Sequence, residues 1–264
     1  MKPLILLILC LLTIQVFAQN GTYTAKDGTS VDIDIMDADP DNVRHASVNL
    51  GMYGMDGVKF LQANYYVPKL FYINGSIGEQ CFMVDGNFFL INTTKQKNVS
   101  TIAKMASTGY GQTRYIVKLP LEKRISIGAH AGFGSTNYSS DFNSTGHLPF
   151  SSKYAIAGFT FFKARNLNFV VDDEREFKLN VITKLNLDAV FYFDRKINEG
   201  ADETRTIDEL SRKVGVRLYY EGRNTFYSRH GRMGFSYILG GGLNGDNTEK
   251  YSIFFGLGMF YAFL

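Results

Sequence analysis

The chain has 264 residues and a formal net charge of +3, with its basic residues spread along it rather than gathered in a block. This distribution excludes the concentrated basic surface of a nucleic-acid-binding protein, so no nucleic-acid partner is expected. The mean hydropathy of −0.09 and the lack of a long apolar run after the N-terminus exclude a later membrane-spanning helix. The 22 Phe, 16 Tyr and 26 Gly, beside only 5 Pro, favour β-strands in which apolar and polar residues alternate.

The N-terminus has the pattern of a secretory signal peptide. Lys2 is followed by an apolar run over residues 4–12 and by Val16 and Ala18, which suit cleavage after Ala18. The apolar run is too short to cross a bilayer as a helix. Residues 1–18 are therefore predicted to be removed, and the mature chain leaves the cytoplasm. Cys81 is then its one cysteine, which forbids an internal disulfide and favours a packing role.

Strand-like runs fill the rest of the chain after a polar lead at residues 19–30, which we expect to be flexible. Residues 31–36 alternate apolar and acidic side chains and give a weak strand signal. Eleven stronger runs follow, over residues 44–53, 58–67, 70–78, 81–91, 110–119, 124–134, 152–162, 177–193, 213–223, 232–243 and 251–264.

An acidic turn separates the weak run from the stronger ones. Asp37, Asp39 and Asp41 repeat at every second position, as the first ligands of a calcium loop do. A complete loop would carry Gly at the sixth position and Glu at the twelfth, where this chain has Asn42 and Val48. The three aspartates are thus a weak metal candidate, and a solvated acidic turn is the favoured interpretation.

The run over residues 177–193 has one apolar and one polar face. Leu185 and Leu187 fall on the apolar face, whereas Lys184 and Asp188 fall on the other. A helix of period 3.6 would scatter these charges around its circumference. The pattern predicts a strand with one face in lipid and the other turned inward.

The last run is the most apolar part of the mature chain, and small residues alternate with its large ones. In this the chain resembles bacterial outer-membrane β-barrels, whose aromatic-rich last strand closes the cylinder. The resemblance implies an all-β fold with a single antiparallel transmembrane barrel over residues 31–264, located in the outer membrane of a Gram-negative bacterium. It also implies contacts with outer-membrane lipid and with the barrel-assembly machinery, which would recognise an apolar face made of Leu257, Met259, Tyr261 and Phe263.

Connection lengths suggest the strand number. In such barrels the long loops lie outside, the turns in the periplasm are short, and the C-terminus is periplasmic. Successive strands run in opposite directions. With residues 120–123 as a periplasmic turn, the long connections therefore lie outside only if a further strand precedes residue 44, and residues 31–36 supply it. The prediction is twelve strands, with residues 31–36 paired to the last strand, and ten strands is the alternative. The long outer connections are residues 92–109, 135–151 and 194–212.

Charged residues within the strands are expected to face the lumen, because a charge in hydrocarbon is costly. A slightly basic wall would suit an anion pore, but mutual salt bridges could equally fill a narrow barrel, and the filled lumen is favoured. Asp85 is among the acidic members. The other expected lumen-lining charges are Arg114, Lys118, Lys178, Lys184, Asp188, Arg217 and Glu221.

No catalytic constellation is evident. His130 falls in mid-strand on the predicted lumen face with Ser126, but the spacing supplies no orienting carboxylate for a triad. We therefore predict no enzyme, no catalytic residue and no cofactor. Three functions remain open: a structural or accessory barrel whose loops or rim meet an envelope partner, a narrow porin-like pore for small solutes, and a barrel enzyme acting on lipid or lipopolysaccharide. The first is favoured.

Overall fold

The computed structural model describes residues 19–24, 30–53, 58–79, 81–108, 111–137, 150–171, 175–197, 214–225, 232–243 and 251–263. The predicted signal peptide, residues 1–18, lies outside these residues. In the described part of the chain, no helix is both long and apolar enough to cross a membrane.

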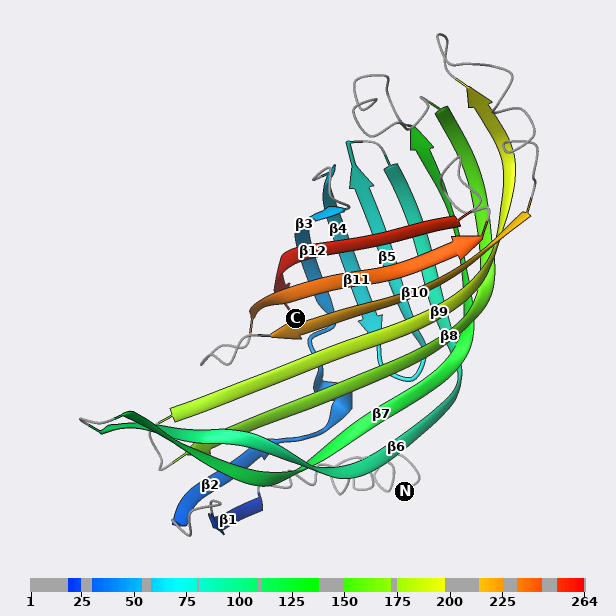
Figure 1. Cartoon of the computed structure of the whole chain (residues 1–264). Helices are drawn as coiled ribbons and strands as arrows, with labels where there is room; N and C mark the ends of the chain where they lie inside the picture. The colour runs from blue at the N-terminus through cyan, green and yellow to red at the C-terminus, as the bar shows by residue number, and fades with distance from the viewer. Residues whose placement is uncertain are drawn as a thin grey trace, which may run out of the picture.

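Ten antiparallel strands close into a barrel, so the predicted all-β antiparallel barrel is confirmed (Figure 1). Each strand pairs with the next along the chain, and the last pairs with the first. The barrel strands are β3 (Ala46–Tyr53), β4 (Val58–Val67), β5 (Phe71–Gly78), β6 (Cys81–Thr108), β7 (Gly111–Asn137), β8 (Phe150–Val171), β9 (Arg175–Ile197), β10 (Val214–Thr225), β11 (Met233–Leu243) and β12 (Tyr251–Phe263).

The prediction of twelve barrel strands was wrong, and ten, the alternative, is the number observed. Residues 31–36 do form a strand, β2 (Ser30–Asp37), but β2 lies outside the barrel between β1 (Gln19–Thr24) and the far end of β8. The partner of β12 is β3, paired without interruption from Phe263 opposite Ala46 to Gly256 opposite Tyr53. Part of the expected flexible lead is also ordered, as β1.

Two predicted connections proved to be strand. β6 and β7 pair from Cys81 opposite Thr136 to Thr108 opposite Gly111, so most of the predicted outer loop at residues 92–109 lies in β6. The predicted turn at residues 120–123 lies within β7, where Pro120 faces Asn98. A strand outside the hydrocarbon needs no lipid-facing apolar side chains, so the polar composition of residues 92–108 resembles that of a loop.

These long strands run beyond the barrel at the end where β3 begins and β12 ends, which we call the terminal end; the opposite end is the loop end (Figure 1). There β7 leaves β8 after Lys123 opposite Arg165, and β2 pairs with β8 instead, at residues 168–171. We call β1, β2 and the projecting parts of β6 to β9 the terminal lobe. Its core is apolar and consists of Ile33, Ile35, Val117, Leu119, Leu121, Leu167, Phe169 and Val171.

The outer face of the barrel is apolar and exposed. Phe159 and Phe193, for example, are 71% and 68% exposed. The predicted apolar face of the last strand, Leu257, Met259, Tyr261 and Phe263, is also exposed, as are Leu185 and Leu187. A band of large apolar side chains around a closed sheet is the surface that a lipid bilayer solvates, and closure leaves no strand edge within it.

Candidate functional site

Buried side chains inside the barrel form a polar middle layer and an apolar cluster at the terminal end, and a smaller apolar cluster lies between β8 and β9. Near the loop end, Tyr154, Ile156, Val190 and Tyr192 form a buried cluster. The middle layer contains the charged residues. At the terminal end a second apolar cluster comprises Val43, Tyr66, Tyr72, Phe89, Phe162, Ala164 and Ile182.

The middle layer is built on two ion pairs between neighbouring strands. On β9 and β10, Lys184 stands directly opposite Glu221 and Asp188 stands directly opposite Arg217. Lys184 Nζ lies 2.9 Å from Glu221 Oε2, and Arg217 Nη2 lies 3.4 Å from Asp188 Oδ2. All four residues are at most 5% exposed. Alternation places the four side chains on one face of the sheet, and antiparallel pairing matches the charges.

His130, from β7, joins this layer to β6. Its Nδ1 lies 2.6 Å from Asp188 Oδ1 and its Nε2 lies 3.1 Å from Asp85 Oδ1. Only the doubly protonated ring can donate to both carboxylates. Lys184 Nζ also lies 3.8 Å from Asp85 Oδ1, so Asp85 links the histidine to the lysine. The five charged groups and the imidazole form one continuous chain across the lumen.

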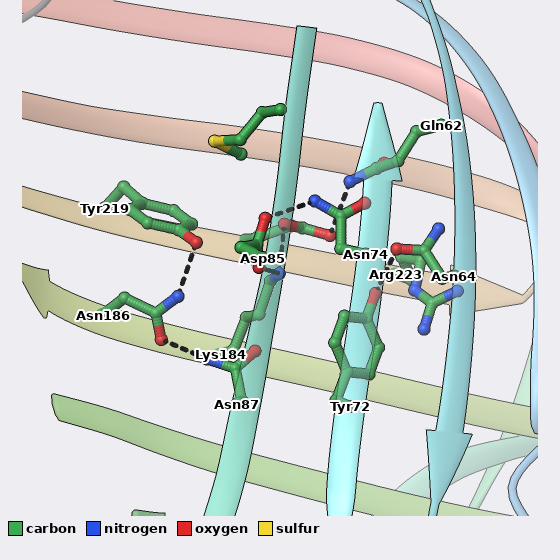
Figure 2. Close-up of polar contacts among 12 residues, drawn as sticks. Gln62, Asn64, Tyr72, Asn74, Asp85, Asn87, Lys184, Asn186, Tyr219 and Arg223 are labelled. Carbon is green, nitrogen blue, oxygen red and sulfur yellow. Dashed lines mark hydrogen bonds and ion pairs between the residues drawn. The ribbon is translucent and has the colours of Figure 1, made fainter. Parts of the chain in front are cut away.

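Neutral polar side chains extend the network around the wall, and Figure 2 shows this part of it. Asn74 Nδ2 donates to Asp85 Oδ2 at 2.7 Å, and Asn186 Nδ2 donates to the Tyr219 hydroxyl at 2.6 Å. Lys184 Nζ lies 4.6 Å from the centre of the Tyr72 ring, a cation–π contact. A buried charge is tolerated when such partners surround it.

The opposite wall carries a second set of hydrogen bonds. Asn49 Nδ2 donates to Gln62 Oε1 at 2.8 Å, and Ser236 Oγ donates to Asn49 Oδ1 at the same distance. Gln62 Nε2 lies 3.5 Å from Glu221 Oε1, which connects this set to the charged pairs. Polar contacts therefore join strands on both sides of the lumen.

Aromatic rings pack across the terminal end of the lumen. The Phe162 ring lies 4.7 Å from Phe89 and 5.1 Å from Tyr66, measured between ring centres. Val43, in the segment that leads into β3, packs into the same cluster. The segment before β3 thus packs into this apolar cluster, which we call the apolar plug. A small recess beside this plug is lined by Val43, Arg44, Asn180, Ile182, Arg223, Thr225, Phe260 and Ala262.

The predicted lumen charges fall in different places. Lys184, Asp188, Arg217 and Glu221 meet in the middle layer together with Asp85. The remaining three do not join them: Lys118 is exposed on the terminal lobe, Lys178 is half-buried on β9 opposite Asn168, and Arg114 lies in the projecting part of β7 with its side chain outside the described residues.

The acidic turn serves the junction between lobe and barrel. Asp39 caps a short 3₁₀ helix, Pro40–Asn42, and accepts a hydrogen bond from the Asp41 amide. Asp41 lies 2.6 Å from Arg124 and 3.0 Å from Lys69, while Asp37 accepts from the side chain of Asn166 at 2.8 Å. The three carboxylates therefore have different protein partners, and no cluster able to hold a metal occurs among the described residues.

Sequence reasoning missed the neutral part of the network. Asn49, Gln62, Asn74 and Asn186 are all at most 4% exposed. Each occupies an alternate position in a strand whose other face is apolar, and this signal could have identified them. Charged residues could be assigned to the lumen because a charge in lipid is costly, whereas neutral amides do not give this signal.

The arrangement offers little chemistry to a substrate. His130 is 1% exposed, and both of its ring nitrogens lie at carboxylates. The hydroxyl of Ser126 donates to Asn92 Oδ1 at 2.6 Å, toward the terminal end. The buried groups can hold the strands together through the ion pairs and hydrogen bonds that join β6, β7, β9 and β10.

Comparisons with known proteins add little. No family model and no curated protein matches the chain. Among solved structures, it is similar to OmpT (in-vitro folded), an outer membrane protein of Vibrio cholerae, at 12% identity over 88% of this chain and 98% of that one, with a TM-score of 0.19. The trimer form of OmpT from Vibrio cholerae gives 12% identity over 88% and 99%, with a TM-score of 0.17. The closed sheet and its apolar outer face define the class of the fold.

Proposed function

We propose that this outer-membrane β-barrel is a non-catalytic structural or accessory component of the bacterial envelope, presenting a rim to another envelope protein. One observation carries the proposal: buried side chains from several strands meet inside the barrel, in the polar middle layer and in the apolar cluster at the terminal end. A conducting barrel needs a continuous polar path, and the apolar cluster at the terminal end opposes one. The chain also has a folded lobe at its terminal end, which a simple closed barrel would not need.

The proposal includes a cellular setting. The mature chain begins after Ala18 and lies in the outer membrane of a Gram-negative bacterium, where the barrel-assembly machinery receives its last strand. The terminal end, with the lobe, faces the periplasm. The supporting features are the signal-like N-terminus and the apolar face of β12, on which Met259 and Tyr261 are half exposed.

Electrical recording tests the absence of a path. Purified, refolded protein in planar bilayers should give no steady single-channel current, while an open porin in the same lipid gives regular steps. In parallel, photo-crosslinkers at exposed lobe positions should yield one defined adduct in native envelopes. Regular current steps from the pure protein, or the lack of any adduct, would contradict the proposal.

A narrow pore is the second candidate, and one arrangement favours it. Lys184 Nζ lies between two carboxylates, 2.9 Å from Glu221 and 3.8 Å from Asp85. A shift of the ammonium from Glu221 toward Asp85 would keep the lysine paired with a carboxylate while rearranging the middle layer. Brief, rare current steps that change in Lys184→Met would support this candidate. An enzyme acting on lipid or lipopolysaccharide has no comparable support among the described residues, where the buried His130 lies between carboxylates.

A further inference from the structure

In the terminal lobe, the outer edge of β6 has no strand partner among the described residues, and β7 likewise pairs with β6 alone before Lys123. β5 pairs with β6 only as far as Phe71 opposite Phe88. Two further bonds end this contact: the Phe89 amide donates to the Leu70 carbonyl at 2.9 Å, and Asn92 Nδ2 donates to the Lys69 carbonyl at 3.0 Å. Beyond Asn92, β6 continues to Thr108 and pairs with β7 alone.

This edge is regular over a useful length. Between two register shifts, β6 pairs with β7 without interruption from Ile91 opposite Ile127 to Ile102 opposite Ile116. The part of this stretch beyond Asn92, residues 93–102, offers roughly 31 Å of backbone at about 3.4 Å per residue. An unpaired row of amide and carbonyl groups of this length is a template for an added strand.

The lysines of the projecting β6–β7 pair indicate which charge an added strand should carry. Lys95 on β6 stands directly opposite Lys123 on β7, and Lys95 is exposed. Like charges directly opposite are unfavourable in a sheet, so a negative neighbour on the free side would relieve them. The edges of two copies would instead bring lysines together, which disfavours a dimer through β6. The acidic strand of this chain, β2, is engaged with β8 elsewhere in the lobe.

We propose that the free edge of β6 in the terminal lobe receives an extended, acidic peptide segment of an envelope partner as an additional strand. The inference rests on the proposed accessory function and assigns its partner surface. Main-chain hydrogen bonds supply the affinity and the ribbon lysines supply the selectivity for acidic segments. The terminal lobe then becomes the docking module, and the filled barrel its membrane anchor.

Labelled peptides test both parts of this inference on the full-length protein in detergent. The probe is a ten-residue peptide alternating Asp with Val, and fluorescence anisotropy measures its binding. Two matched probes carry Lys in place of Asp, or keep Asp but have alternate backbone amides N-methylated. We expect binding of the first alone, because the second is repelled and the third cannot form the strand ladder. Equal binding of the N-methylated probe would overturn strand addition, and no binding of the Asp peptide would overturn the proposal.

Substitutions locate the surface. In Lys95→Glu/Lys123→Glu, binding of the Asp peptide should fall at least tenfold while the folded, heat-modifiable band on unboiled gels is retained. Lys59→Glu is the matched control, since Lys59 is an exposed lysine at the loop end. Unchanged binding in the double variant would assign the peptide to another surface and overturn the proposal. Bilayer recordings on the same preparation report on the proposed function separately: current steps with intact peptide binding reject that function alone.

Discussion

Lys184 and Glu221 are directly opposite residues of β9 and β10, and their charged atoms lie 2.9 Å apart inside the barrel. The same two strands carry Asp188 and Arg217 four residues further along, with the order of charges reversed. In an antiparallel pair this spacing makes both contacts attractive, and a shift by two residues would break both. The pairs therefore help to specify the register of β9 against β10.

Removing the lysine should be costly. Lys184→Met leaves Glu221 without its nearest cation in a layer that is almost wholly buried. A buried charge that loses its partner typically costs about 3–5 kcal/mol, so a loss of this order is expected in the free energy of unfolding. Urea titration of the barrel refolded into lipid, followed by the heat-modifiable band, measures it.

A double variant distinguishes the loss of the whole ion pair from the loss of the lysine alone. Lys184→Met/Glu221→Leu removes both charges, and we expect it to recover most of the loss, since an apolar replacement of a buried pair is often neutral. Lys118→Met on the exposed part of the lobe should change the stability little. If Lys184→Met changed the free energy of unfolding as little as Lys118→Met, the ion pair would not contribute to stability.

The inward direction of the charged residues of this layer could be predicted from the sequence, because a charge on the outer face would lie in hydrocarbon. Lys184 and Asp188 lie in a run whose alternate residues are large and apolar, so the polar face must turn inward. Which acid meets which base could not be predicted, because that depends on register. The contact of His130 with both Asp85 and Asp188 joins three strands and has no local signature.

The outer face gives a second prediction. Leu187 is 50% exposed on β9, and its neighbours in register, Phe159 and Leu218, are also exposed and apolar. Leu187→Arg would place a cation in hydrocarbon, and we expect a cost of about 2–4 kcal/mol with impaired assembly. Leu187→Phe keeps the surface apolar and should fold normally. The fraction of protein that gains the heat-modifiable form measures both, and equal yields would place Leu187 outside the lipid.

Barrel closure gives a third prediction. Leu50 of β3 stands directly opposite Met259 of β12, and both side chains are exposed. In a Cys81→Ser background, cysteines at these two positions should form a disulfide on mild oxidation, because directly opposite residues bring their Cβ atoms close. A pair at Ile33 and Met259 should not, since β2 adjoins β8. Mobility on non-reducing gels decides, and cross-linking of the second pair alone would restore a twelve-stranded barrel.

The lobe shows where sequence reasoning reached its limit. Ile33 and Ile35 alternate with aspartates, and the chain could place such a strand in a barrel or beside one. The deciding factor is tertiary: Phe169 and Val171 of β8 offer a neighbour and an apolar surface outside the lipid. The predicted count of twelve strands assumed short periplasmic turns. It failed because β6 continues beyond the barrel as a strand paired with β7, although residues 92–109 have the polar composition of a loop.

The last prediction uses this separation of lobe and barrel. Phe169 is fully buried in the lobe core, and its ring stacks on Phe177 with centres 5.2 Å apart. Phe169→Ala should cost the lobe about 3–5 kcal/mol, as truncation of a buried aromatic does. Because β3 to β12 close the barrel without β1 and β2, the heat-modifiable band should persist while protease begins to cleave within β1, β2 and the projecting ribbon. Met36→Ala, at a half-exposed position in β2, should leave protease resistance unchanged. If Phe169→Ala removed the folded band altogether, the lobe and the barrel would have to fold as a single cooperative unit.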